Sequence, residues 1–89
     1  MTSSEVIKQL EQAQAATQAA IGALNSLIVP HDYQDVAGLV AQAALQLLGA
    51  TQALMQSDDT RAFAAIEQAD ELLEGAFAII DSELEDDEE

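Results

Sequence analysis

Apolar residues recur at intervals of three and four along most of this chain, which is the spacing of one face of an α-helix. The pattern is broken at Pro30, because a proline disfavours helical geometry in the residue that precedes it. It is broken again at the polar run 56–59, where serine and aspartate are residues that favour a helix start. The chain therefore divides into three segments of similar length. These segments predict helices at about 3–28, 33–56 and 58–84.

Each predicted helix carries a stripe that should face its neighbours. In the first helix this stripe, which is polar in the middle, comprises Ile7, Leu10, Gln14, Thr17, Ile21, Leu24 and Ile28. In the second helix it comprises Val36, Val40, Ala43, Leu47, Thr51 and Leu54. In the third helix we expect the large side chains to face inward, namely Phe63, Ile66, Leu73, Phe77, Ile80 and Leu84. The second helix is the most apolar around its circumference, which predicts that it is the central element.

The two predicted connections are short, and short connections favour antiparallel neighbours. The expected fold is therefore an all-α, antiparallel three-helix bundle with up-down-up topology, forming a single domain over residues 1–84. Counting from the ends of the two hairpins places Gly22, Gly38 and Gly75 at about the same level. Since a glycine inside a helix costs about 1 kcal/mol relative to alanine, this coincidence predicts close backbone contact there.

Residues at the expected helix starts have the side chains that cap helices. Thr2 followed by Glu5 fits a capping box for the first helix, in which the two side chains satisfy backbone amides of the first turn. Asp32 is expected to cap the second helix, because its carboxylate can accept a hydrogen bond from the first turn. Ser57 or Asp58 is expected to cap the third helix for the same reason.

Charge is distributed unevenly along the chain. Thirteen of the seventeen acidic residues lie in 58–89, where Arg61 is the single basic residue, whereas 12–30 and 36–57 carry no charged side chain. The formal net charge of −15 opposes binding to nucleic-acid phosphates and to anionic lipid, and it makes a basic protein surface the natural partner. Residues 85–89 are all acidic, and acids at a helix C-terminus oppose the helix dipole. We therefore expect a disordered acidic C-terminal tail there.

One side of the third predicted helix is lined by acidic residues, namely Glu67, Asp70, Glu71, Glu74, Asp81 and Glu85. We expect a non-enzymatic protein–protein interaction module that docks on a basic partner surface through these residues. One alternative is that the acids only keep the protein soluble. Another is a nucleic-acid mimic that inhibits a DNA- or RNA-binding protein, as small acidic phage inhibitors do. Helix neighbours three or four residues apart are about 5–6 Å apart, which is comparable with the spacing of phosphates along a strand.

The uncharged surface of the first two helices predicts self-association, most simply as a two-fold homodimer. The second helix has more apolar surface than one stripe of a three-helix bundle requires, and the first helix has little charge to keep a partner away. The candidate residues for this contact are Gln14, Thr17, Ile21, Leu39, Leu48 and Met55. A purely structural homo-oligomer with no other partner is a third alternative for the function.

Residues that carry chemistry are scarce in this sequence. The chain contains no cysteine and one histidine, His31, which follows a proline and is expected to be an exposed turn residue. A metal site would need more nitrogen ligands or a fixed set of carboxylates. The sequence also has no glycine-rich phosphate loop and no nucleophile elbow. We therefore expect no catalytic, metal or cofactor site and no enzymatic activity.

Residues 36–57 form an uncharged run that is long enough to cross a bilayer. Four glutamines interrupt the run, namely Gln42, Gln46, Gln52 and Gln56, and no lysine or arginine flanks it as a topology anchor. The first residues have no basic region followed by an apolar core, so no secretory signal is expected. We expect a cytoplasmic protein that makes no membrane contact and in which this run is a buried helix.

Overall fold

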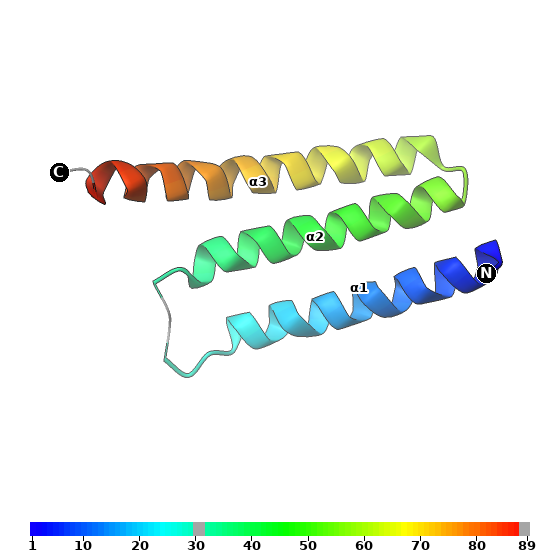
Figure 1. The fold of residues 1–89 in the computed structure, drawn as a ribbon, viewed down its shortest axis with the longest axis horizontal. Coiled ribbons are helices and arrows are strands. Elements are labelled where there is room, and N and C mark those ends of the chain that lie inside the picture. Colours follow the sequence, from blue (N-terminus) through cyan, green and yellow to red (C-terminus); the bar gives the residue numbers. More distant parts are fainter. Residues whose placement is uncertain (30–31, 88–89) are drawn as a thin grey trace.

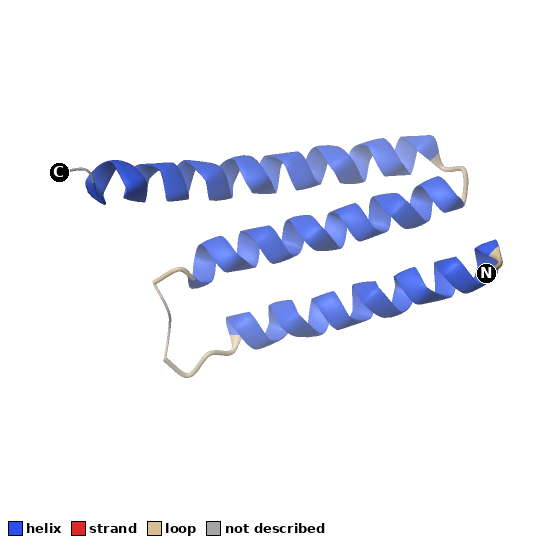
Figure 2. Ribbon diagram, viewed as in Figure 1, coloured by secondary structure: helices blue, strands red, loops and turns tan. Residues whose placement is uncertain are grey.

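In the computed structural model, which describes residues 1–29 and 32–87, the chain forms three α-helices joined by short connections (Figures 1 and 2). Helix α1 spans Ser3–Asn25, α2 spans Gln34–Met55 and α3 spans Asp59–Asp87. Successive helices run in opposite directions (Figure 1). The expected all-α, antiparallel, three-helix fold with up-down-up topology is therefore confirmed.

Two parts of the sequence fall outside this description. The turn residues Pro30 and His31 are among them, so the exposure expected for His31 stays a prediction. The other part is Glu88 and Glu89, at the end of the expected acidic tail. Helix α3 continues beyond the expected boundary at residue 84 as far as Asp87.

Helix α1 begins at the capping box that the sequence predicts. The Glu5 N–H donates a hydrogen bond to Thr2 Oγ1 over 3.2 Å, and the Thr2 hydroxyl lies 3.3 Å from Glu5 Oε1. At its other end α1 stops at Asn25, earlier than expected, where the Ser26 hydroxyl donates to the Gly22 carbonyl over 2.7 Å. The serine side chain thereby satisfies one of the carbonyl groups that the last helical turn leaves without a partner.

The prediction that Asp32 caps α2 is wrong. The capping position is Tyr33, which makes no side-chain capping hydrogen bond. Its backbone angles, φ −98° and ψ 10°, are those of a turn rather than the extended geometry that a capping serine or aspartate adopts. The chain enters α2 through this turn, so the helix starts later than the residue that the sequence favours.

The connection between α2 and α3 is a tight left-handed turn. Ser57 has a φ of 58°, and its N–H donates to the Leu54 carbonyl over 3.1 Å. The Asp58 N–H donates to the Ala53 carbonyl over 2.8 Å, which completes the hydrogen-bond pattern of a Schellman motif. The Asp58 carboxylate then accepts the Arg61 N–H over 3.1 Å. Asp58 therefore closes α2 with its backbone. Its side chain caps α3, which is one of the two caps that the sequence predicts.

The three helices lie side by side in one layer, with α2 in the middle (Figure 1). Within the described residues, α2 packs against both neighbours, whereas no Cα atom of α1 lies within 8 Å of a Cα atom of α3. This confirms that the second helix is the central element. The Cα radius of gyration is 15.7 Å, whereas a compact domain of this length has a radius of about 12 Å. The chain is therefore more extended than a closed bundle of this length.

Helices α2 and α3 pack along a seam of small side chains, because both helices bury an alanine or a valine at every seventh position. These residues, called the alanine seam below, are Val36, Ala43 and Ala50 on α2 and Ala62, Ala69 and Ala76 on α3. Positions seven apart lie on nearly the same side of a helix, and small side chains allow the two axes to approach closely. Leu39 and Gly75 mark the register, since Leu39 Cδ1 lies 3.7 Å from where a Cβ on Gly75 would be.

The prediction that the large side chains of the third helix face inward is wrong. Phe77 is 76% exposed and Phe63 is 65% exposed. The other four members are exposed as well, namely Ile66, Leu73, Ile80 and Leu84. Two members of the second-helix stripe, Val36 and Ala43, are buried, and the others are exposed, namely Val40, Leu47, Thr51 and Leu54. A helix pair approaches most closely on one stripe, and here that stripe carries the smallest residues rather than the largest.

The stripe expected on the first helix is confirmed for six of its seven members. The half-buried ones are Ile7, Leu10, Gln14, Thr17, Ile21 and Leu24, and Ile28 lies beyond the end of α1 and is exposed. No residue of α1 is fully buried. Helix α1 is therefore held on one side alone, by α2.

The glycines do not supply the close backbone contact that their common level predicts. A Cβ placed on Gly22 or Gly38 would meet no atom within 4 Å. A Cβ on Gly75 would make an ordinary van der Waals contact with Leu39. That prediction is wrong, and the alanine seam provides the close approach instead.

Candidate functional site

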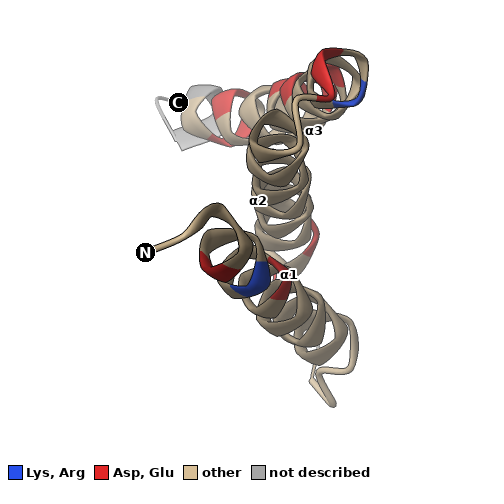
Figure 3. Cartoon of the chain, turned by 90° about the vertical axis from the view of Figure 1, so that its right-hand side faces the viewer, with Lys and Arg blue, Asp and Glu red and all other residues tan. Residues whose placement is uncertain are grey.

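Several acidic residues of α3 lie on the side of the helix that points away from α2. Since Ala62, Ala69 and Ala76 face α2, the residues half a turn away from them face outward. Glu67, Glu71 and Glu74 lie about half a turn from the seam, and Asp70 and Asp81 about a third of a turn. The six acids expected on this side, called the acidic edge below, are Glu67, Asp70, Glu71, Glu74, Asp81 and Glu85. The first five are exposed, and the side chain of Glu85 lies outside the described side chains. Figure 3 shows the acidic residues following α3 along one edge of the layer.

The acidic edge can act through its electric field. Like charges gathered along one helix produce a negative potential that extends about one Debye length, roughly 8 Å at physiological ionic strength. Acid–base catalysis would need carboxylates held in a cleft that shifts their proton affinity. The described members of the acidic edge are exposed instead. This arrangement is suited to attracting a positively charged surface.

A second surface follows from the alanine seam. Four residues after each seam position, the chain has a large aliphatic residue. These residues, called the apolar row below, are Val40, Leu47 and Leu54 on α2 and Ile66, Leu73 and Ile80 on α3. They are between 38% and 56% exposed. In an antiparallel helix pair, positions that follow the seam by four residues come to the same side from both helices.

The apolar row is continuous across the two helices. Counting from the facing pair of Leu39 and Gly75 brings Leu47 about level with Ile66. The exposed Phe63 and Phe77 extend the apolar surface on the outer side of α3. This apolar surface is therefore built from side chains that the α2–α3 pair leaves partly in water.

Asp70 joins the two surfaces. It follows Ile66 by one helical turn and precedes Leu73 by nearly one turn, so it lies at the margin of the apolar row. It is exposed, and it is also a member of the acidic edge. A contact that covered the apolar row would therefore bring this carboxylate close to the covering surface.

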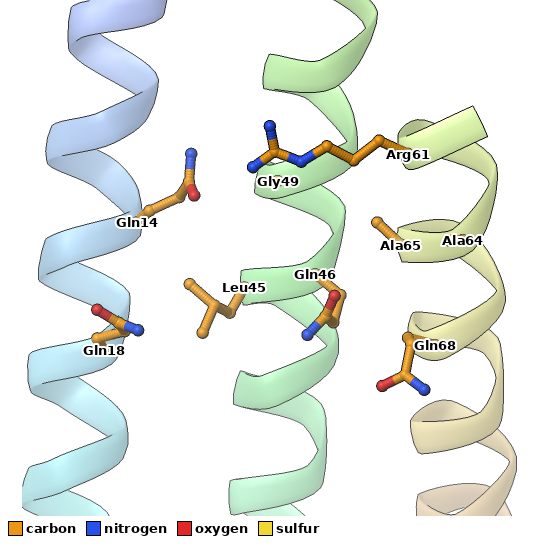
Figure 4. A pocket seen from close by; sticks show the side chains of 9 residues that line it. All are labelled: Gln14, Gln18, Leu45, Gln46, Gly49, Arg61, Ala64, Ala65 and Gln68. Carbon is orange, nitrogen blue, oxygen red and sulfur yellow. The ribbon is translucent and has the colours of Figure 1, made fainter. Parts of the chain in front are cut away.

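The opposite side of the layer has a groove lined by glutamines and by apolar residues of all three helices, called the polar groove below (Figure 4). A hollow of about 420 Å³ is lined by Gln14, Gln18, Leu45, Gln46, Gly49, Arg61, Ala64, Ala65 and Gln68. No carboxylate, hydroxyl or thiol is among these lining residues. Gly49 and Gln68 each follow a seam position by six residues, so their presence here places the apolar row on the other side of the layer.

The six residues proposed for self-association do not form one surface. Gln14 Nε2 donates to Gln52 Oε1, which joins α1 to α2 within one chain. The Thr17 hydroxyl donates to the Ala13 carbonyl over 2.7 Å, Ile21 lines a hollow of the polar groove, and Leu39 lies beside α3. Leu48 is half-buried and Met55 is exposed. The assignment of these residues to a contact between chains stays a prediction, and several of them serve contacts within the chain.

Among the described residues, no three His, Cys, Asp or Glu side chains lie close enough together to hold a metal ion. Within the same part of the chain, α2 is the one helix long and apolar enough to cross a membrane, with a mean hydropathy of 1.2. A single helix of this kind is weak evidence for a membrane span, because central helices of water-soluble proteins meet the same criterion. Helix α2 has a neighbour on each flank, but 28% of its apolar window is buried, so the expectation that this run is a buried helix is wrong.

Comparison of the chain with protein-family models, with curated proteins and with solved structures finds no match. The acidic edge and the apolar row are thus the features on which a function can rest. The sequence predicts the acidic edge but not the apolar row, because the large aliphatic residues of the row match a stripe that would face the interior of a closed bundle. The signal that identifies the row is the seven-residue repeat of alanine on α2 and α3, with an aliphatic residue four positions after each repeat.

Proposed function

We propose that this chain is a non-enzymatic, cytoplasmic protein–protein interaction module that docks on a basic partner surface through the acidic edge of α3. The observation that carries the proposal is the position of α3 at the border of the layer. Its alanines face α2, so Glu67, Glu71 and Glu74 face outward, and no described helix packs against them. A whole side of one helix is in this way available to a partner.

The docking mechanism is electrostatic steering followed by close contact. Complementary charge raises the rate of encounter, and this effect falls as salt screens the field. Arg61 is the one basic residue of α3, and it lies at the polar groove rather than on the acidic edge. The negative potential of the edge is therefore not offset by a basic side chain of the same helix.

A nucleic-acid mimic is the second candidate. It is favoured by the placement of Glu67, Glu71, Glu74 and Asp81 along one side of a single 29-residue helix. Carboxylates one turn apart on such a helix can occupy phosphate positions in a basic groove. This candidate predicts that DNA or RNA and the acidic edge compete for one site on the partner. An interaction module that binds elsewhere on its partner predicts no competition.

The test is a pull-down from source-cell lysate at low and at high salt, using the wild type and the variant Glu67→Gln, Glu71→Gln, Glu74→Gln. We expect a protein that is retained at low salt, released at high salt and lost with the variant. Its association rate with the variant should fall by about tenfold or more, because steering contributes 10- to 1000-fold to such rates. Adding DNA or RNA to the wild-type pull-down then separates the two candidates.

The matched control removes three acids that lie outside α3, in the variant Glu5→Gln, Glu11→Gln, Asp32→Asn. Its net charge changes by the same amount, while the acidic edge is intact. Equal loss of the partner with both triple variants would mean that net charge alone is responsible and that the acidic edge is no docking site. Binding that survives in the α3 variant would exclude the edge directly.

A further inference from the structure

The chain exposes more surface to solvent than a compact protein of the same mass. Its accessible surface is 6355 Å², whereas a compact monomer of 9.4 kDa exposes about 5000 Å². The difference of about 1300 Å² exceeds the roughly 800 Å² that each partner contributes to a stable protein–protein interface. The excess surface of the whole chain is therefore larger than one side of a stable interface.

The uncovered apolar side needs a second layer. Helices carrying an apolar stripe form stable domains when two layers of secondary structure enclose a common core. Within the described residues this protein has one layer, with a polar groove on one side and the apolar row on the other. We propose that a second copy of the chain covers the apolar row, so that two layers enclose a shared core in a six-helix homodimer.

The chemistry of the surface beside the row favours a second copy as the occupant. Next to the row, α2 presents Ala37, Ala44 and Thr51, which are exposed, small and uncharged. Small side chains there allow α2 of one copy to approach α2 of the other closely. Residues 36–57 carry no charge, so a basic partner would find complementary charge only at the α3 border, whereas a copy presents the same apolar surface.

Charge also selects the arrangement of the two copies. If α3 packed on α3, the two acidic edges would repel each other. A two-fold axis roughly parallel to α2 instead packs α3 of one copy against α1 of the other. Helix α1 has no charged side chain at residues 12–25, and the acidic edges then lie at opposite borders of the dimer. We therefore assign this arrangement, with the two α2 helices parallel across the axis.

The first test is sedimentation equilibrium of the purified full chain from about 1 to 100 μM, the range of ordinary dimer affinities. We expect the mass of a dimer. The variant Leu47→Gln, Leu73→Gln should weaken the dimer by at least about 100-fold, because each leucine contributes at least about tenfold when buried. The control Leu27→Gln, Ile28→Gln removes two exposed aliphatic residues away from the row and should leave the dimer unchanged.

Circular dichroism of the Leu47→Gln, Leu73→Gln variant shows whether a loss of the dimer is dissociation or unfolding. The two leucines are partly exposed in the single chain, so the variant is expected to stay helical when it dissociates. If it unfolds, the single change Leu73→Gln takes its place. A wild type that is monomeric over the whole range would overturn the proposal. So would a dimer that the row variants leave intact, or a monomer that binds phosphatidylcholine vesicles through the row.

Disulfide cross-linking tests the arrangement, since the chain has no cysteine of its own. Ala37→Cys, Ala44→Cys and Thr51→Cys, made one at a time, should each give a cross-linked dimer, because parallel α2 helices bring identical residues together at every level. Ile66→Cys should give none, since the two α3 helices lie at opposite borders. Cross-linking at Ile66 alone would overturn the assigned arrangement. The dimer does not depend on docking at the acidic edge, so either proposal can fail without the other.

Discussion

The side-chain amide of Gln14 on α1 donates a hydrogen bond to Oε1 of Gln52 on α2, at a part-buried position between the two helices. This bond lies where the α1 stripe turns polar, among apolar residues toward both ends. A polar pair inside an apolar contact sets the register, because any slip leaves both amides without partners. The polar middle of the α1 stripe, which the sequence reveals, thus has a structural role in placing α1.

Replacing either glutamine of this pair should therefore destabilise the fold. We expect Gln14→Leu or Gln52→Leu alone to lower the free energy of unfolding by about 1 kcal/mol, since each leaves the other amide part-buried and unpaired. The double replacement should cost less than the sum of the two. Urea unfolding of all four proteins, arranged as a double-mutant cycle, measures the coupling. Additive effects of the two changes would contradict a direct bond.

Replacing Ser57 with glycine should stabilise the protein. Its φ of 58° lies in the left-handed region, where a side chain costs about 1–2 kcal/mol and glycine is not penalised. Against the greater entropy of glycine in the unfolded chain, we expect Ser57→Gly to raise the free energy of unfolding by roughly 0.5 kcal/mol or more. Ser57→Ala is the control, because it keeps the Cβ and should give no gain. Thermal unfolding at matched protein concentration would show the difference.

The alanine seam should not accept a larger residue. Ala69 is 1% exposed and lies between α2 and α3, so we expect Ala69→Leu to force the helices apart at a cost of about 1–3 kcal/mol. Ala78 lies on the same helix but is exposed, and Ala78→Leu should change the stability by about 0.5 kcal/mol or less. Denaturant unfolding of both variants tests this. Equal stability of the two variants would mean that the α2–α3 pair does not pack on its alanines.

The sequence predicts the buried side of α1 correctly, but it does not predict the buried side of α3. On α1 the large apolar residues form a single stripe, so choosing by size gives the right face. On α3 two stripes lie side by side, one of alanines through Ala69 and one of large residues through Leu73. Choosing by size selects the wrong one, because the distance between α2 and α3 decides which stripe is buried. That distance is a property of the pair and is not visible in either helix alone.

The acidic edge and the apolar row also differ in how far the sequence predicts them. Charged side chains avoid burial wherever the helices meet, so the sequence alone places the acidic edge on an exposed side of α3. The exposure of the apolar row depends on the layer being open, and the openness follows from the separation of α1 and α3, whose Cα atoms lie more than 8 Å apart in the described residues. Hydrophobic residues are expected inside a closed bundle. In an open layer the same residues become a surface.

Asp70 provides a test that separates the two proposals, because it belongs to the acidic edge and borders the apolar row. In the homodimer its carboxylate lies beside an apolar, uncharged surface. Asp70→Asn should therefore tighten the dimer by roughly twofold to fivefold, the size of an exposed charge effect. On immobilised poly-lysine, a probe of the acidic edge, the same variant should bind more weakly by a similar factor.

Sedimentation equilibrium and surface-binding measurements on the same Asp70→Asn preparation give the two numbers. Asp35→Asn is the control, since Asp35 lies in the first turn of α2 and belongs to neither surface. The two effects should have opposite signs, because the charge favours a basic partner and opposes the approach of an apolar surface. If Asp70→Asn weakened both associations, the dimer would depend on that carboxylate. The contact between copies would then involve the acidic edge rather than the apolar row.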